Sequence, residues 1–169
     1  MKKIQEQFAR LNRELEILLK EWEQTPEAIL QKKKPDDGWS NLQAGWHLIK
    51  SERQTLEYIR KKIQGGSEIA KAGLKARLRH FVLVTSLRLP IRFRAPVSSI
   101  HPPDETNSKE TIEEWRKTRH NWAEFLKTFP EDMAGREIFR HPLAGRLSLH
   151  QTLDFFQQHF RHHLRQLRG

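Results

Sequence analysis

Cysteine is absent from the 169-residue chain, and its absence excludes several kinds of chemistry. A chain without thiols cannot form a disulfide, bind a metal through thiolates or use a cysteine as nucleophile. The lack of cysteine also fits a reducing compartment. We therefore expect a cytoplasmic protein.

Long apolar runs are also missing. No window approaches the roughly 20 consecutive apolar residues that a membrane-spanning helix needs. The first 24 residues, "MKKIQEQFARLNRELEILLKEWEQ", are amphipathic and charged, which is not typical of a signal peptide. We expect no membrane partner, and the length favours a single domain over residues 1–169.

The formal net charge of +10 raises the question of nucleic acid binding. A basic domain can bind phosphates and gain affinity from the counterions that it releases. Here, however, the basic residues occur in every segment and are mixed with 21 acidic residues. No motif that reads bases is recognisable. We expect a solvated basic surface and no specific nucleic acid partner.

Apolar residues recur at helical spacing in five segments. The predicted helices lie at residues 2–22, 40–64, 68–87, 108–129 and 148–167. Two of them start with the Ser-x-x-Gln pattern of a capping box, Ser40 with Gln43 and Ser148 with Gln151. Residues 88–107 contain four prolines and no clear period, which indicates a long crossing connection. No strand pattern is evident. The sequence predicts an all-α fold, a four-helix bundle with an extra short helix and a long connection.

The motif "HFRHH", residues 159–163, places three histidines in the last predicted helix. At about 100° per residue, one apolar stripe of this helix is formed by Leu149, Leu153, Phe156, Phe160, Leu164 and Leu167. His159 and His163 fall together along one edge of the stripe, and His162 falls toward solvent. The pattern predicts that His159 and His163 face the margin of the bundle.

A helical His-x-x-x-His pair is not a complete metal site, because a catalytic zinc ion usually has three protein ligands and one open position. The third ligand must come from elsewhere in the chain. Periodicity does not choose among the remaining candidates, which are His47, His80, His101, His120, His141 and His150. For His141, which precedes Pro142 in a predicted turn, a structural role and a pocket role both stay open.

Three segments of the chain resemble signatures of the DinB-like family. They are "WSNLQAGWHLIKSE", "RFRAP" with the prolines after it, and "FRHPLAGRLSLHQTLDFFQQHFRHHLRQL". The resemblance covers nearly the whole chain, and the three segments occur in the order and at the separations of that family. The resemblance implies a four-helix bundle with a divalent metal ion, zinc or nickel, bound at one end.

The resemblance also carries the family's metal ligands onto His47, His159 and His163. This set agrees with the choice of histidines made from the helical stripe. Glu52 and Gln166 match the family pattern as well, and the resemblance makes them weaker candidates for side chains that orient the imidazoles.

The implied activity is that of a metal-dependent enzyme, a hydrolase or a thiol transferase. In the second case, a low-molecular-weight thiol is added to a small electrophilic substrate, and the sulfur comes from the cosubstrate because the chain has no cysteine. Two alternatives stay open, a metal-binding stress or interaction protein without catalysis and a basic nucleic-acid-associated protein.

We also expect a homodimer, for two reasons. The first is the family resemblance. The second is a set of aromatic residues that one small bundle would not fully bury: Trp22, Trp115, Trp122 and Phe125.

Overall fold

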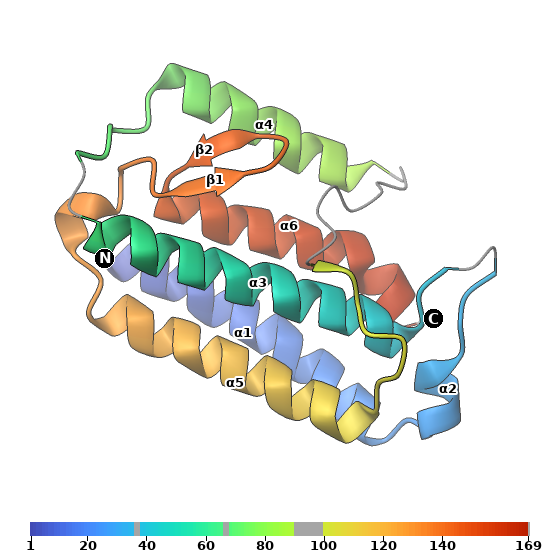
Figure 1. Ribbon diagram of the computed structural model, residues 1–169. Helices are drawn as coiled ribbons and strands as arrows, with labels where there is room; N and C mark the ends of the chain where they lie inside the picture. Colours follow the sequence, from blue (N-terminus) through green and yellow to red (C-terminus); the bar gives the residue numbers. More distant parts are fainter. Residues whose placement is uncertain (36–37, 66–67, 90–99, 169) are drawn as a thin grey trace.

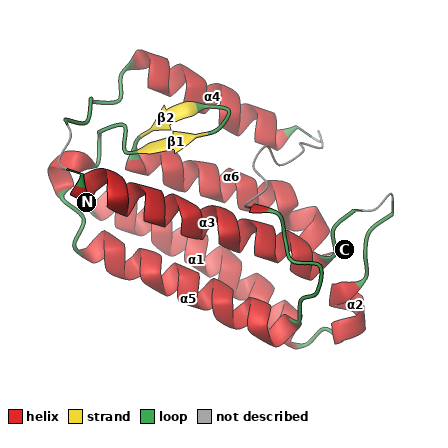
Figure 2. Cartoon of the chain, viewed as in Figure 1, coloured by secondary structure: helices red, strands yellow, loops and turns green. Residues whose placement is uncertain are grey.

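Four long helices lie side by side in the computed structural model, which describes residues 1–35, 38–65, 68–89 and 100–168 (Figures 1 and 2). The bundle helices are α1 (Lys2–Glu23), α3 (Asn41–Gln64), α5 (Ser108–Lys127) and α6 (Leu149–Arg168). Helix α4 (Leu74–Arg88) packs on the outer side of α6. The short helix α2 (Glu27–Gln31) follows α1 in the chain and contacts α3 at the end of the bundle. The predicted all-α bundle is confirmed. The predicted "RFRAP" signature lies outside the described residues.

The directions of α1, α3 and α6 follow from hydrogen bonds at their ends. At the start of α3, the Asn41 side-chain amide donates to the Leu167 carbonyl near the end of α6, at 3.1 Å. Helices α3 and α6 are therefore antiparallel. The Trp22 indole, near the end of α1, donates to the same carbonyl at 2.9 Å. Gln7, near the start of α1, donates to the His150 carbonyl at the start of α6. Helix α1 is therefore parallel to α6.

Both predicted capping boxes are present. The Ser40 hydroxyl accepts from the Gln43 amide, and the Gln43 side chain accepts from the Ser40 amide. Ser148 and Gln151 make the same reciprocal pair at the start of α6. Each box satisfies two backbone donors that a helix start leaves without partners, so the first residue of each helix is well defined.

Helix α4 starts six residues later than predicted. Residues 70–72 are extended instead and bond to the chain before the last helix: the Ala72 amide donates to Gly135, and the Glu137 amide donates to Ala70. This pairing uses backbone groups that a helix would need.

A small hairpin was not predicted. Strands β1 (Phe139–His141) and β2 (Gly145–Leu147) pair antiparallel, after the short 3-10 helix η2 (Glu131–Met133). Gly145 has a φ of 69°, in the left-handed region that favours glycine. Strands of three residues are too short to show an alternating pattern, which explains why the sequence gives no strand signal.

The tryptophans of the bundle are buried within one chain. Trp22, Trp115 and Trp122 are each at most 2% exposed. Gly45 makes room for two of them, because a Cβ there would lie 2.9 Å from the Trp22 ring and 3.3 Å from the Trp115 ring. The expectation that these tryptophans need a second copy for burial is therefore wrong. The homodimer remains a prediction from the family resemblance.

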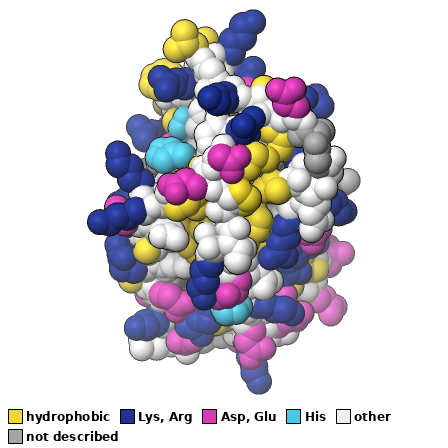
Figure 3. Space-filling view, turned by 90° about the vertical axis from the view of Figure 1, so that its left-hand side faces the viewer, with side chains coloured by type: hydrophobic (Ala, Val, Ile, Leu, Met, Phe, Trp, Pro, Cys, Tyr) yellow, Lys and Arg dark blue, Asp and Glu magenta, His cyan; other side chains and the backbone are white. Residues whose placement is uncertain are grey.

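The surface mixes charges of both signs, as Figure 3 shows for one face. No described helix is long and apolar enough to cross a membrane.

A buried ion pair joins α3 to α5. The Arg119 guanidinium donates two hydrogen bonds to the Glu52 carboxylate, both at 2.7 Å, and a third to Asn12. Both side chains of the pair are at most 5% exposed. Burial raises the pKa of Glu52, and the adjacent guanidinium opposes that shift. The pair stabilises the bundle only while both partners are present.

We predict that Arg119→Leu lowers the free energy of unfolding by about 3–5 kcal/mol, because it leaves the Glu52 carboxyl buried without its partner. The neighbouring pair of Arg53 and Glu114 is the matched control, since it joins the same two helices at the surface. Arg53→Leu should cost less than about 1 kcal/mol. Urea unfolding followed by circular dichroism measures both values, and equal losses would contradict the prediction.

Candidate metal centre

Three histidines from two helices converge at one end of the bundle. His47 lies about two turns into α3, and His159 and His163 lie one turn apart on α6. One ring nitrogen of each lies within 4.8 Å of the other two. The Nε2 atoms of His47 and His159 are 3.1 Å apart. Among the residues that the structure describes, this is the one group of three such side chains that could hold a metal ion.

Hydrogen bonds on the far side of two rings fix their orientation. Nδ1 of His47 donates to the Ile100 carbonyl at 3.1 Å, and Nδ1 of His163 donates to the Gln166 side-chain oxygen at 2.5 Å. An oxygen of this kind only accepts, so each Nδ1 carries the hydrogen and each Nε2 has its lone pair on the side of the site. Metal-binding histidines commonly have such a partner on the second nitrogen.

The protonation state of the histidines also suits a cation. Burial lowers the pKa of His47 to about 4 and that of His163 to about 3, with nearby imidazoles adding to the shift of His163. Burial and the neighbouring histidines hold the pKa of His159 well below its usual range. All three rings are therefore neutral at pH 7, as metal ligands must be. The donor set fits a divalent ion.

A cavity of about 290 Å³ opens beside the three histidines. Its walls come from α3, α6, the second half of α4 and the hairpin. Apolar side chains form much of the lining: Trp39, Tyr58, Leu83, Leu87, Phe139, Leu143 and Phe155. No Asp or Glu occurs among the described lining residues, and Arg140 is the one Lys or Arg among them. The described lining therefore contributes no carboxylate that would repel an anion.

Aromatic rings support the imidazoles. The Trp39 ring lies over His47, with 4.9 Å between the ring centroids. The Phe155 ring stacks on His159 at 5.1 Å, with 18° between the planes. These contacts limit the rotation of both imidazoles and place apolar surface around the nitrogens.

A family model described as the DinB superfamily matches residues 8–167. The chain belongs to the DinB superfamily. Comparisons with curated proteins and with solved structures find no match.

The other residues predicted for the site of this DinB-superfamily protein lie as follows. The Gln166 side-chain oxygen accepts a hydrogen bond from His163. Glu52 bonds to Arg119 between α3 and α5, away from the cavity lining. The expectation that His162 faces solvent is wrong, because its Nδ1 lies 2.8 Å from the Leu87 carbonyl of α4. The helical stripe could not show that a fifth helix covers this side of α6.

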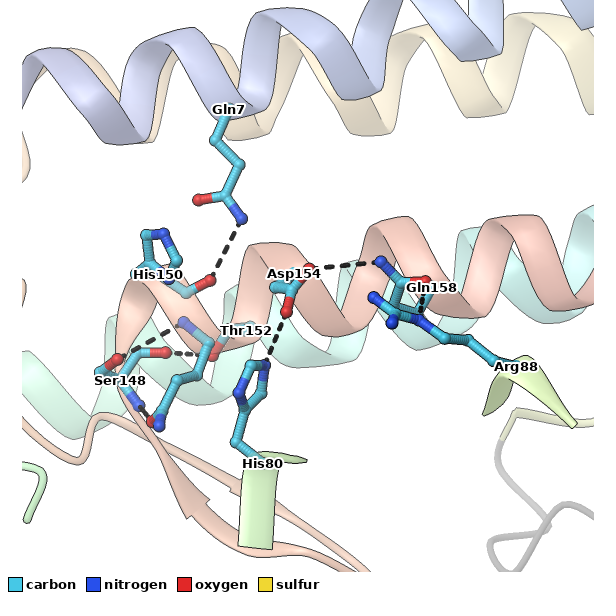
Figure 4. Close-up of polar contacts among 9 residues, drawn as sticks. Gln7, His80, Arg88, Ser148, His150, Thr152, Asp154 and Gln158 are labelled. Carbon is cyan, nitrogen blue, oxygen red and sulfur yellow. Dashed lines mark hydrogen bonds and ion pairs between the residues drawn. The ribbon is translucent and has the colours of Figure 1, made fainter. Parts of the chain in front are cut away.

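The remaining histidines do not join the group of three. His80 of α4 places Nε2 2.9 Å from the Asp154 carboxylate of α6 (Figure 4). His150 lies at the start of α6, where its carbonyl accepts from Gln7. His101 uses its carbonyl to accept from Lys50, and His120 is exposed on α5.

His141 is a cavity residue that the sequence left undecided. Its Nδ1 accepts hydrogen bonds from the backbone amides of Leu143 and Ala144, at 3.2 and 3.1 Å. Burial lowers its pKa to about 4, so the ring is neutral at pH 7 and Nε2 carries the hydrogen. The His-Pro turn therefore has both a structural role and a place in the cavity lining. The motif was visible in the sequence, but the position of the cavity was not.

We predict that His47→Ala, His159→Ala and His163→Ala each weaken zinc or nickel binding by more than about 100-fold, because each removes one of three ligands. Gln166→Leu should weaken binding by about 10–100-fold, because it releases the His163 ring. Isothermal titration calorimetry on metal-free protein measures these affinities. His162→Ala is the control on the same helix and should bind like the unchanged protein. A histidine variant that keeps one tight site would contradict the assignment.

We also predict that the metal-free protein loses stability as the pH falls from about 6.5 toward 4. The pKa of His141 is about 4 in the folded chain and about 6.5 in the unfolded chain, so only the unfolded chain takes up a proton in this window. In His141→Asn, which retains an acceptor but does not titrate, the melting temperature should fall less steeply with pH. Differential scanning calorimetry between pH 7 and 4 compares the slopes, and identical slopes would contradict the prediction.

Proposed function

We propose that this protein is a divalent-metal-dependent enzyme that joins a low-molecular-weight thiol to a small electrophile. The observation that carries the proposal is the convergence of three neutral imidazoles on the wall of a largely apolar cavity. A cavity of this size and lining is suited to a small molecule. Membership of the DinB superfamily agrees with a metal site.

His47, His159 and His163 would hold the ion, with zinc and nickel as the proposed metals because imidazole suits both. When bound, the ion would supply a full positive charge and an open position, which favour the thiolate form of a thiol. The two Nδ1 partners, Ile100 and Gln166, hold the rings with Nε2 toward the site.

The cavity residues would orient the reactants. In the proposed reaction, the thiolate sulfur forms a bond to an electrophilic carbon of the substrate. The leaving group departs with the electron pair of the broken bond, and the thiol proton passes to solvent. The Nε2–H of His141 is a neutral donor that would stabilise negative charge on the leaving group. The lack of carboxylates in the described lining favours an anionic nucleophile.

We predict that the protein with added zinc or nickel accelerates the conjugation of a fluorogenic bimane halide with small thiols. The rate should depend on both metal and thiol, and His47→Ala should reduce it by more than about 100-fold, because the ion is then no longer held. A fluorescence assay over a panel of thiols measures the rate.

His120→Ala is the control for this assay, since His120 is exposed on α5 and is not among the described residues that line the cavity. Turnover of ester substrates without thiol would support the hydrolase instead. Tight metal binding without turnover of the thiols or of the esters would contradict the enzyme proposal. It would indicate a metal-binding protein without catalysis.

A cytoplasmic location and a homodimer complete the proposal. The lack of cysteine supports the first, and the family resemblance supports the second. Sedimentation velocity at several concentrations tests the dimer, and a monomer at every concentration would end that part of the proposal.

A further inference from the structure

Helix α4 has two apolar faces, and only one of them is buried. Ala76, Leu83, Val84 and Leu87 pack inward. The opposite face carries exposed side chains, with exposed fractions of 81% for Leu74, 65% for Leu78, 63% for Phe81, 58% for Val82 and 47% for Leu89. At 100° per residue the four positions within the helix fall within an arc of about 100°, and Leu89 follows the last helical residue. They form one continuous apolar stripe. Its width is that of a helix face which packs against another apolar surface.

Basic side chains flank this stripe on both sides. Lys75 lies on one side and Arg77 and Arg88 on the other, and all three are exposed. Arg79 is half-buried and pairs with Glu137 of the neighbouring segment. Figure 3 shows apolar and basic side chains side by side at the top of the molecule, where α4 lies.

The charge of this segment differs from that of the whole chain. Residues 69–103 contain seven lysines and arginines and no aspartate or glutamate. The interpretation that acids are mixed into every segment is therefore wrong here. A large part of the +10 net charge belongs to the segment that carries the exposed stripe.

We propose that the outer face of α4 docks on an anionic membrane surface, with the helix lying parallel to the bilayer. An apolar stripe flanked by Lys and Arg is the pattern by which amphipathic helices bind at the interface of an anionic bilayer. The earlier expectation of no membrane partner considered only a spanning helix, and surface docking needs none.

The charge and the apolar stripe of α4 favour an anionic membrane over a second copy of the chain and over a nucleic acid. A second copy packed on the same face would bring one set of flanking basic residues, Lys75, Arg77 and Arg88, toward an identical set, and like charges repel. A nucleic acid would be attracted by the basic residues, but it would leave Leu78 and Phe81 without an apolar partner. A bilayer with anionic headgroups provides partners for both kinds of side chain.

Docking would also bring the cavity near the bilayer. Leu83 and Leu87 lie on the inner face of α4 and line the cavity. One helix diameter, about 10 Å, separates the two faces. This inference does not depend on the proposed reaction.

Co-sedimentation with large vesicles tests the proposal. We expect binding to phosphatidylcholine vesicles that contain roughly one quarter phosphatidylglycerol, weaker binding to phosphatidylcholine alone, and a decrease with added salt. The double variant Leu78→Glu with Phe81→Glu should lower the partition coefficient at least about tenfold, because it removes both the apolar contact and part of the positive field.

The matched control is the double variant Ile17→Glu with Ile29→Glu. It changes the net charge by the same amount at isoleucines that are 55% and 53% exposed on α1 and α2. The control should bind vesicles much more tightly than the α4 variant. Circular dichroism shows whether both variants keep the helical fold.

Three results would overturn the proposal. The first is no binding to the anionic vesicles, and the second is an equal loss of binding in both double variants, which would indicate net charge alone. The third is evidence that a different partner binds the outer face of α4. A dimer that only the α4 variant dissociates, or duplex DNA binding that only this variant loses, would assign the face to a second copy or to nucleic acid.

Discussion

The antiparallel packing of α3 against α6 is the constraint on which the candidate site depends. The nitrogens of His47 and His159 meet although the residues are 112 positions apart in the sequence. The Leu167 carbonyl, which accepts from both Trp22 and Asn41, joins the end of α6 to the start of α3 and the end of α1. The capping boxes at Ser40 and Ser148 set where the two helices start. A shift of one residue would rotate a histidine by about 100° and remove it from the group.

Two groups of buried polar side chains lie on different sides of α3. The cost of burying a charge is offset in one group and avoided in the other. The Glu52 carboxylate has the Arg119 guanidinium as its partner, so this contact is complete within the chain. The histidines have no carboxylate in their hydrogen bonds, and burial keeps them neutral by lowering the pKa of each. Neutral imidazoles with inward lone pairs can accept a cation without first losing a proton. The first group is already complete as a structural contact between α3 and α5, and the second is suited to binding.

The sequence predicted the features that depend on local pattern. Apolar periodicity gave the four bundle helices, the Ser-x-x-Gln patterns gave two helix starts, and the stripe of α6 selected His159 and His163. His47 could not be found in this way, because it lies off the apolar stripe of α3, and it entered only through the family resemblance. The later start of α4 and the contact of His162 with Leu87 arise from packing between distant segments. No pattern within one helix contains that information.

Helix α4 connects the exposed stripe to the candidate site through a small number of contacts with α6. His80 lies beside Asp154, and this contact is the largest cause that lowers the pKa of Asp154. Farther along, Arg88 donates to Gln158 (Figure 4). The Leu87 carbonyl is bonded to His162. The middle and the C-terminal end of α4 are thus held to one face of α6, the face next to His159 and His163. A displacement of α4 would therefore also move the cavity wall, because Leu83 and Leu87 belong to this helix and line the cavity.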